Sequence, residues 1–322
     1  MNIFMKKVFS ILLILCMLFS VSFASAKPVA RVAAMKGPTA MGMVKMMQDD
    51  AGETYDFNVI VAIDEINAML VKGELNIAAV PANVASVLYN KTKGGIQVLA
   101  INTLGVLYIV ENGDTVTSIE DLRGRTIYSA GKGATPEYSL NYVLSSNGID
   151  PEKDVTIEYK SEQAECLSAL LANPGSVAMM PQPFVTTAQT KAEGVRIALD
   201  MTQEWANLQE NAESPSAMLT GVVVVRKEFA EANPEVVNAF LDSYNASVTF
   251  TNANVDEAAA IIAAYDIIPE AVAKKAVPYC SLACIEGAEM QTKLAGYLNV
   301  LFEQKPSAVG GALPNEDFYY QR

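Results

Sequence analysis

The stretch "LNIAAVPANVASVLYNKT", residues 75–92, decides the expected fold. Its first six residues, "LNIAAV", form a short apolar run of the kind that becomes a buried strand. The turn Pro81-Ala82-Asn83 follows, and the apolar spacing of "VASVLYNKTK" (84–93) favours a helix. A strand, a tight turn and a helix in this order are the repeating unit of an α/β protein.

The same unit recurs along the chain. We expect further strands at "FNVIVAI" (57–63), "IQVLAIN" (96–102), "RTIYSA" (125–130), "DVTIEYK" (154–160) and "SVAMMPQPF" (176–184), most of them followed by a helical pattern. This alternation predicts a mainly parallel α/β architecture. The pattern restarts after Gly105 and again near Gly221, and 322 residues are enough for two lobes with separate cores.

Four strand-to-helix turns have similar composition. They are "KGPT" (36–39) after the first strand, "PAN" (81–83), "GKGATPE" (131–137) and "PQPF" (181–184). Glycine and proline fit tight turns whose backbone can approach a ligand. Because the carboxyl ends of parallel strands lie at one edge of a sheet, these turns predict a ligand site at that edge.

The first residues have the pattern of a secretory signal peptide. Lys6 and Lys7 precede the apolar run "VFSILLILCMLFSVSF", and Ala24-Ser25-Ala26 has the small residues of a cleavage site. We therefore expect residues 1–26 to be removed near Ala26 and the protein to be exported. The formal net charge of −13 argues against nucleic acid or an anionic membrane surface as a partner.

Cysteine and histidine usage narrows the chemistry further. Cys166, Cys280 and Cys284 follow the expected cleavage site, too few for a disulfide framework. Cys280 and Cys284 are spaced either to face each other on one helical turn or to be buried as apolar residues. The chain has no histidine, and so it lacks the commonest metal ligand and the commonest general base. We expect no metal, no cofactor and no catalytic residue.

Several segments together resemble the periplasmic substrate-binding proteins of ABC importers. They are residues 75–92, "SIEDLRGRTI" (118–127), "MMPQPFVTTA" (179–188) and "TGVVVVRKEFAEANPEVVNAFL" (220–241). The similarity is to the branch that binds nitrate, sulfonates, taurine and pyrimidine precursors of thiamine, and it covers essentially the whole mature chain. The family's Pro-Glu-Pro-Phe turn has Gln182 in place of the acid, so the ligand of any one member should not be transferred.

The resemblance implies a two-lobed, type II periplasmic binding protein of the Venus-flytrap kind with two crossover strands. One lobe would comprise residues 27–104 and 220–322, and the other residues 105–219. The ligand would lie between the lobes, and the lobes would close around it by a hinge motion. The implied partners are a small-molecule ligand and an ABC permease with a cytoplasmic ATPase, and we expect a periplasmic monomer.

The candidate ligand-binding residues lie at the four turns and at the two crossovers. They are Thr39, Ala40, Met41, Pro81, Asn83, Asn102, Thr103, Lys132, Thr135, Gln182, Pro183, Phe184 and Thr220. Thr39 and Thr135 each place a hydroxyl at a helix start, which suits an anion or a carbonyl oxygen.

Several of these candidates also have an ordinary structural explanation, and Asn102 and Thr103 at the first crossover could serve as a hinge. Thr39 and Asn83 can cap helices, and Lys132 can be solvated. Met41 and Phe184 can belong to the core. Trp205, the single tryptophan, lies in a polar helical stretch near the second crossover, where we expect it to pack on the surface or to cap the cleft.

These observations predict a solute-binding protein for an ABC importer. Its ligand would be a small organic compound that is anionic or accepts hydrogen bonds, such as a sulfonate, a carboxylate or a heteroaromatic compound. Two alternatives stay open. One is an enzyme on the same scaffold, similar to the chorismate dehydratases, and the other is a solute sensor that does not transport.

Overall fold

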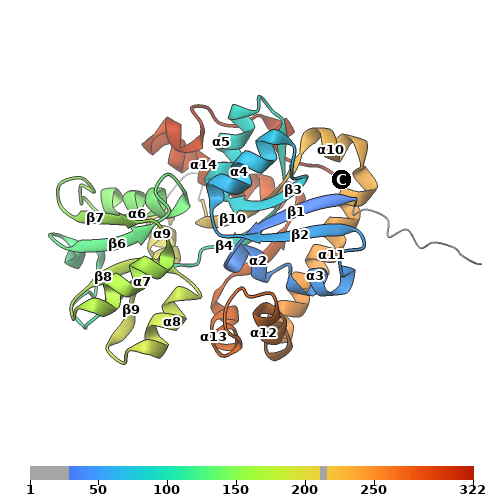
Figure 1. Cartoon of the computed structure of the whole chain (residues 1–322). Helices are drawn as coiled ribbons and strands as arrows, with labels where there is room; N and C mark the ends of the chain where they lie inside the picture. Colours follow the sequence, from blue (N-terminus) through green and yellow to red (C-terminus); the bar gives the residue numbers. More distant parts are fainter. Residues whose placement is uncertain (1–28, 211–215) are drawn as a thin grey trace, which may run out of the picture.

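The computed structural model describes residues 29–210 and 216–322. The expected signal peptide, residues 1–26, and its cleavage near Ala26 lie outside the described residues. The described residues form two β-sheets that lie side by side, each covered by helices (Figure 1). This α/β arrangement confirms the expected fold class.

The six-stranded sheet joins the first strands of the chain to two late ones, in the order β11-β4-β10-β3-β1-β2. Its strands are β1 (Ala30–Met35), β2 (Tyr55–Ile60), β3 (Ile77–Pro81), β4 (Ile96–Leu104), β10 (Leu219–Arg226) and β11 (Leu282–Ile285). The helices of this part of the fold are α2 (Pro38–Met41), α3 (Val44–Asp50), α4 (Ile63–Lys72), α5 (Ala82–Lys91), α10 (Lys227–Ala232), α11 (Pro234–Ala253), α12 (Val255–Ala264), α13 (Glu270–Ala276) and α14 (Gly287–Gln304). Three 3-10 turns complete it: η2 (Val277–Tyr279), η3 (Pro306–Val309) and η4 (Glu316–Phe318).

The five-stranded sheet is built from the middle of the chain, in the order β7-β6-β8-β5-β9. Its strands are β5 (Leu107–Asn112), β6 (Thr126–Ala130), β7 (Thr156–Lys160), β8 (Val177–Pro181) and β9 (Val195–Asp200). The helices with it are η1 (Ile119–Leu122), α6 (Thr135–Ser146), α7 (Gln163–Ala172), α8 (Phe184–Lys191) and α9 (Met201–Gln209).

Strand directions are mixed in both sheets. Strand β1 is parallel to β2 and β3, and β6 is parallel to β7 and β8. In contrast, β10 is antiparallel to β3 and β4, β11 to β4, and β5 to β8 and β9. The expectation of mainly parallel pairing is therefore wrong. For β5 and β10 the reason is that each enters its sheet from the other sheet, and not through a helical crossover on the same one.

The sequence of β3 is continuously apolar because both faces of this strand are buried. All five of its residues are buried, and successive side chains point to opposite faces. Ile77 and Ala79 belong to the core with α3 and α11, whereas Ala78 and Val80 belong to the core with α5 and α14. The second of these cores continues into the five-stranded sheet through Leu107 and Ile109. Packing thus joins the two sheets.

The chain passes between the sheets at Gly105 and again between α9 and β10. A Cβ atom at Gly105 would lie 2.0 Å from the Oγ1 atom of Thr202 and 2.9 Å from the Cε atom of Met218, so no side chain fits there. The strand–helix alternation was expected to restart after Gly105 and near Gly221, close to these two passages. The assignment of residues 105–219 as a separate lobe stays a prediction.

Candidate ligand-binding site

A cavity of about 100 Å³ lies between the two sheets. From the side of the six-stranded sheet it is lined by Met35, Lys36, Gly37, Pro38, Thr39, Pro81, Thr103 and Thr220. From the side of the five-stranded sheet it is lined by Val106, Leu107, Thr135, Pro136, Gln163, Pro181 and Phe184. Most of these groups are apolar, and a few hydroxyl and amide groups are placed among them.

All four turns singled out in the sequence reach this cavity. Residues 36–39 follow the end of β1, and Pro81 ends β3. Thr135 begins α6 after the loop that follows β6, Pro181 ends β8, and Phe184 begins α8. Gly37 has a φ of 132°, which a residue with a Cβ atom rarely adopts. The tight turn after β1 therefore needs glycine, and it brings Thr39 to the cavity.

Two hydroxyl groups of the cavity wall have no partner in the protein. Thr103 is completely buried, and the Oγ1 atoms of Thr103 and Thr220 are both buried without a hydrogen bond. A buried hydroxyl without a partner costs about 1–3 kcal/mol. Thr39 differs, because its Oγ1 atom donates to the Met35 carbonyl at 2.5 Å. The hydroxyls of Thr103 and Thr220 are thus the ones best placed to bind a ligand.

Asn102 lies beside the cavity, although it does not line it. Its side chain is 1% exposed, and both its amide nitrogen and its amide oxygen are unpartnered. A Cβ atom at Gly221 would lie 2.4 Å from the Asn102 oxygen and 3.0 Å from the Cγ2 atom of Thr39. Because Gly221 has no side chain, Asn102 can lie close to Thr39 at the cavity wall.

The structure brings six of the thirteen predicted residues to the cavity wall: Thr39, Pro81, Thr103, Thr135, Phe184 and Thr220. Seven do not line it: Ala40, Met41, Asn83, Asn102, Lys132, Gln182 and Pro183. Ala40 and Met41 are fully buried in the core with α3 and α11, so the core explanation holds for Met41.

Asn83 and Gln182 use their amide groups within the protein. Asn83 donates to the carbonyl groups of Ala308 at 3.0 Å and of Gly133 at 3.3 Å, and its oxygen accepts from Thr135 at 3.4 Å. The Gln182 oxygen accepts from the Thr186 hydroxyl at 2.8 Å and from its backbone N–H at 3.2 Å. This last pair of bonds caps the first turn of α8.

Sequence reasoning missed Gln163, which lines the cavity and whose side-chain oxygen is buried without a hydrogen bond. Gln163 is the first residue of α7 and follows the carboxyl end of β7, a parallel strand. The turn before it, "SE", has no glycine or proline, and so it did not stand out. Its position after a parallel strand was the available signal.

The family model described as ABC transporter, phosphonate, periplasmic substrate-binding protein matches residues 40–272. This is more than half of the chain. The chain belongs to this family. No curated protein matches it at a significant level. Members of the family are exported proteins that bind solutes for transport, and the resemblance seen in the sequence is confirmed.

Solved structures of ABC substrate-binding proteins share this fold. An ABC transporter protein from Parabacteroides distasonis is 23% identical with a TM-score of 0.75, covering 91% of this chain and 99% of that one. The periplasmic aliphatic sulphonate binding protein SsuA from Escherichia coli is 15% identical with a TM-score of 0.71, covering 91% and 92%. The ligand-binding component of an ABC-type import system from Staphylococcus aureus is 13% identical with a TM-score of 0.70, covering 91% and 96%.

Two lysines lie at or near the cavity of this binding protein. The Lys36 ammonium lies 3.5 Å from the Asp266 carboxylate. Lys132 lies outside the wall, with its ammonium 5.7 Å from the centre of the Tyr159 ring. Burial, and to a smaller extent Glu137, raises the pKa of the Tyr159 phenol, which therefore stays protonated. Lys36 is the lysine of the cavity wall, and its partner Asp266 is fully exposed to solvent, so this pair neutralises the Lys36 charge only weakly.

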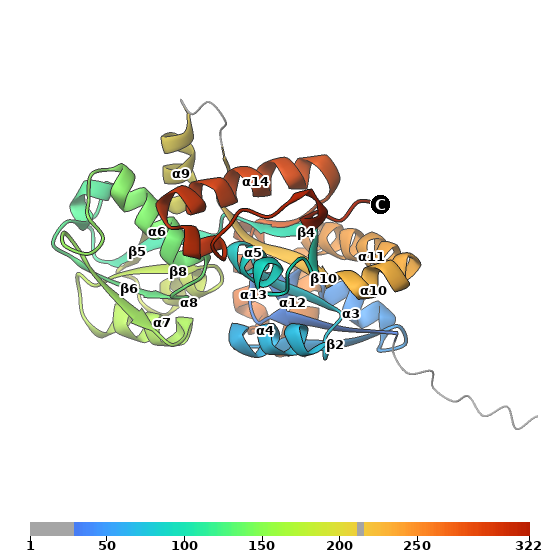
Figure 2. The same ribbon diagram turned by 90° about the horizontal axis from the view of Figure 1, so that it is seen from above.

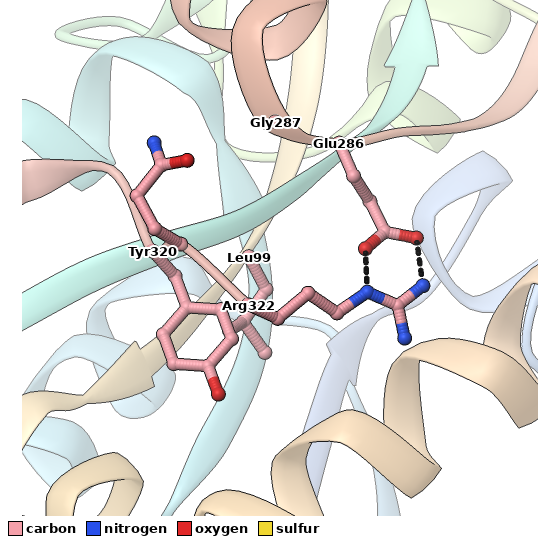
Figure 3. Close-up of a pocket in the computed structure, with 6 residues that line it drawn as sticks. Leu99, Glu286, Gly287, Tyr320 and Arg322 are labelled. Carbon is pink, nitrogen blue, oxygen red and sulfur yellow. Dashed lines mark hydrogen bonds and ion pairs between the residues drawn. The ribbon is translucent and has the colours of Figure 1, made fainter.

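A second hollow, of about 280 Å³, lies near the C-terminal residues (Figure 3). It is lined by Leu99, Glu286, Gly287, Tyr320, Gln321 and Arg322. The Arg322 guanidinium binds the Glu286 carboxylate at 2.9 Å and the Asp242 carboxylate at 2.6 Å. Because this guanidinium already has two carboxylate partners, the hollow is a weaker candidate for a ligand than the cavity between the sheets.

Over residues 29–210 and 216–322, no cluster of three or more histidine, cysteine or acidic residues is arranged to hold a metal ion. Cys166, Cys280 and Cys284 are free thiols. Burial raises the pKa of both Cys280 and Cys284 to about 12, which keeps the two thiols protonated at neutral pH. Within the same residues, no helix has the length and apolar character needed to cross a bilayer.

Proposed function

We propose that this protein captures one small organic solute in the cavity between its sheets and delivers it to an ABC permease with a cytoplasmic ATPase. The observation that carries the proposal is the pair of buried, unpartnered hydroxyls of Thr103 and Thr220 in a mostly apolar wall. Such a wall, with a few convergent polar groups, is typical of a ligand site. The expected classes are sulfonates, carboxylates and heteroaromatic compounds.

The proposed contacts are made by residues from both sheets. Thr39, Pro81, Thr103 and Thr220 would bind from the six-stranded sheet, and Thr135 and Phe184 from the five-stranded sheet. A solute held by both would favour the arrangement in which the sheets are close together. We propose that the protein acts in the periplasm as a monomer.

A thermal-shift screen against these compound classes tests the proposal. A compound that binds only the folded protein raises its melting temperature. For each hit we expect the Thr103→Val and Thr220→Val variants to bind with roughly tenfold lower affinity, because each loses a hydrogen bond worth about 1 kcal/mol or more. Thr292→Val is the matched control, since Thr292 is exposed on α14 and its hydroxyl bonds the Ala288 carbonyl.

Two outcomes would count against this function. The first is a hit whose affinity is the same in both cavity variants, which would locate binding elsewhere. The second is conversion of the bound compound to a product, detected by mass spectrometry after incubation with the protein. That result would favour the alternative of an enzyme on this scaffold.

A further inference from the structure

We infer that the ligand binds with a compact polar head group against the two crossover strands and with its apolar body toward the five-stranded sheet. The crossover strands are β4, which ends just before Gly105, and β10, which returns from the five-stranded sheet. Asn102, which lies beside the cavity wall, then selects the head group together with Thr103 and Thr220, and this placement rests on the proposed function.

The pairing of the two crossover strands is irregular where they pass the cavity. Gly221 of β10 pairs with Thr103 of β4, and the register of the two strands shifts on both sides of this pair. The shift before Gly221 leaves Thr220 as an extra residue on β10, and the shift after it leaves Asn102 as an extra residue on β4. A β-bulge of this kind redirects a side chain, and bulges are frequent next to functional sites. Two neighbouring bulges therefore take the side chains of Thr220 and Asn102 out of the regular alternation of the sheet.

The three polar side chains at these bulges have unused hydrogen-bonding groups. The hydroxyls of Thr103 and Thr220 and both ends of the Asn102 amide are buried without a partner among the described residues. Asn102 is 1% exposed, and Thr103 is completely buried. Because both amide atoms are unpartnered, Asn102 offers one donor and one acceptor whichever way its amide is turned. A head group with several polar atoms is the complement that these three side chains need.

Asn102 lies close enough to the cavity wall to take part in binding. A Cβ atom at Gly221 would lie 2.4 Å from the Asn102 oxygen and 3.0 Å from the Cγ2 atom of Thr39, and Thr39 lines the cavity. Since Gly221 has no side chain, the space between these two groups stays open. A head group bound by the Thr103 and Thr220 hydroxyls would then be next to the Asn102 amide.

The helix starts at Thr39 and Thr135, which the sequence suggested for a polar ligand group, have fewer unused groups. The Thr39 hydroxyl donates to the backbone carbonyl four residues earlier at 2.5 Å, and the Thr135 hydroxyl donates to the Asn83 oxygen at 3.4 Å. Pro38 and Pro136, in the first turns of α2 and α6, have no N–H group. The crossover strands therefore offer the head group more hydrogen bonds than either helix start.

The five-stranded sheet presents a mostly apolar surface to the cavity. The apolar residues that line it on this side are Val106, Leu107, Pro136, Pro181 and Phe184. Of the polar residues on this side, Thr135 already has a bonded hydroxyl, and Gln163 is only half-buried. An alkyl or similar body leaves water on this surface, which should raise the affinity roughly fourfold per CH₂ group.

Two series of compounds test the two ends of the ligand separately. The head series keeps an ethyl body and varies the head: ethylphosphonate, ethanesulfonate, propanoate, propanamide and butanone. The body series keeps the best-binding head and lengthens the alkyl chain from methyl to butyl. Calorimetric titration of the full-length mature protein gives the affinity of each probe, and circular dichroism shows whether each variant is folded.

We expect Asn102→Leu to narrow the range of affinities across the head series about tenfold and to leave the gain per CH₂ group unchanged. Phe184→Ala should do the reverse, with a smaller gain per CH₂ group and an unchanged range across the head series. Thr220→Val should behave like Asn102→Leu, and it decides the test if Asn102→Leu does not fold. Asn299→Leu, at an exposed position of α14, is the matched control and should change neither quantity.

A range across the head series that stays unchanged in a folded Asn102→Leu protein would overturn this inference, because a purely structural role of Asn102 weakens every probe alike. A smaller gain per CH₂ group in that variant would also overturn it, since the body would then lie against the crossover strands. The proposed function would survive both results, because the probes still bind. If no probe binds, the inference is overturned, and the broader thermal-shift screen decides on the proposed function.

Discussion

Glu111 shows how one buried charge is stabilised in this protein. Its carboxylate is fully buried in β5, yet it accepts hydrogen bonds from Thr115 and from the backbone N–H of Val116 at 3.0 Å. The Arg196 guanidinium lies 2.7 Å away. Burial acts to raise the pKa of this carboxyl, but the bonds from Thr115 and Val116 and the charge of Arg196 outweigh it and lower the pKa.

Replacement of Glu111 by glutamine should therefore reduce stability in a pH-dependent way. Because the folded pKa lies below the unfolded value of about 4.3, the stabilisation is present above that pH and is lost as the pH falls through the folded pKa. We expect Glu111→Gln to lose about 2–3 kcal/mol of unfolding free energy at pH 7. Since the Arg196 side chain is 35% exposed, solvent screening reduces its share.

Urea unfolding at pH 7 and at pH 3 measures this difference. The difference in unfolding free energy between wild type and Glu111→Gln should narrow at pH 3, because below about pH 4.3 the unfolded chain binds a proton at Glu111 more readily than the folded protein does. Glu120→Gln is the control, because Glu120 is exposed and pairs with Arg123 at the surface. A gap of equal size at both pH values would contradict a role for the Glu111 charge.

Gly221 provides a second test at the scale of a residue. A methyl group at this position would meet the Asn102 oxygen at 2.4 Å and the Thr39 methyl at 3.0 Å. We expect Gly221→Ala to displace Asn102 and to weaken ligand binding roughly tenfold, which corresponds to about 1.4 kcal/mol. Calorimetric titration measures the change. The double variant Gly221→Ala with Asn102→Ala should recover part of the lost ligand affinity. Unaltered affinity in Gly221→Ala alone would contradict the expected displacement of Asn102.

The sequence predicted the backbone of the site better than its side chains. Gly37, Pro38 and Pro81 mark turns because their φ preferences are local properties, and those turns do reach the cavity. The role of Asn83 depends on carbonyl groups that lie nearby only in the folded protein, such as that of Ala308, and no local pattern contains that information. Gln182 differs, because its partner Thr186 lies four residues along the chain.

At the scale of elements, Asn83 joins helices that belong to different sheets. Asn83 is the second residue of α5, just after the end of β3. Its side chain bonds Gly133 in the loop before α6 and Thr135, the first residue of α6. Its third bond reaches the Ala308 carbonyl of η3. Helices α5 and α6 are therefore connected by one fully buried amide.

Removal of this amide should weaken the contact between the two sheets. We expect Asn83→Ala to lose about 1–3 kcal/mol of stability and to release bound ligand several times faster, because Gly133 and Thr135 lose their partner across the interface. Stopped-flow dissociation measures the rate. Asn90→Ala is the matched control, since Asn90 on the same helix bonds the carbonyls of Val309 and Ala312 but nothing on the five-stranded sheet. Equal release rates in the two variants would contradict the expectation.

The existence of the elements was predictable, but the direction of their pairing was not. Apolar runs such as "IAAVP" specify buried strands because both faces of the sheet are covered. The run "TGVVVVR" of β10 looks the same, yet β10 is antiparallel to both neighbours. Strand direction depends on which sheet the chain comes from, and the sequence of the strand itself does not record this.

At the scale of the whole molecule, Trp205 lies where helices from both sheets meet. Sequence reasoning expected it on the surface or over the cleft, and this was wrong, because Trp205 is fully buried. The centre of its ring lies 4.4 Å from the ring centre of Tyr142 in α6 and 5.4 Å from that of Tyr297 in α14. Its indole N–H donates to the Ser216 hydroxyl at 3.0 Å. Figure 2 shows α14 extending from the six-stranded sheet toward α6.

Trp205 should therefore report on the relative movement of the two sheets. If the sheets separate in the absence of ligand, Trp205 loses its contact with Tyr297 and becomes more exposed to water, so its emission shifts to longer wavelength. Saturation with a compound that binds the cavity should shift the emission back. Because Trp205 is the single tryptophan, steady-state fluorescence assigns the signal without ambiguity.

Tyr297→Leu tests the origin of this signal. The variant removes the ring that Trp205 contacts across the interface, so the emission change on ligand binding should shrink while calorimetry still detects binding. Tyr265→Phe, at the end of α12, keeps that contact and should behave like wild type. Emission that stays constant in the wild-type protein on saturation, with binding shown by calorimetry, would mean that the sheets keep one fixed arrangement. A fixed arrangement would exclude hinge closure as the way this protein retains its ligand.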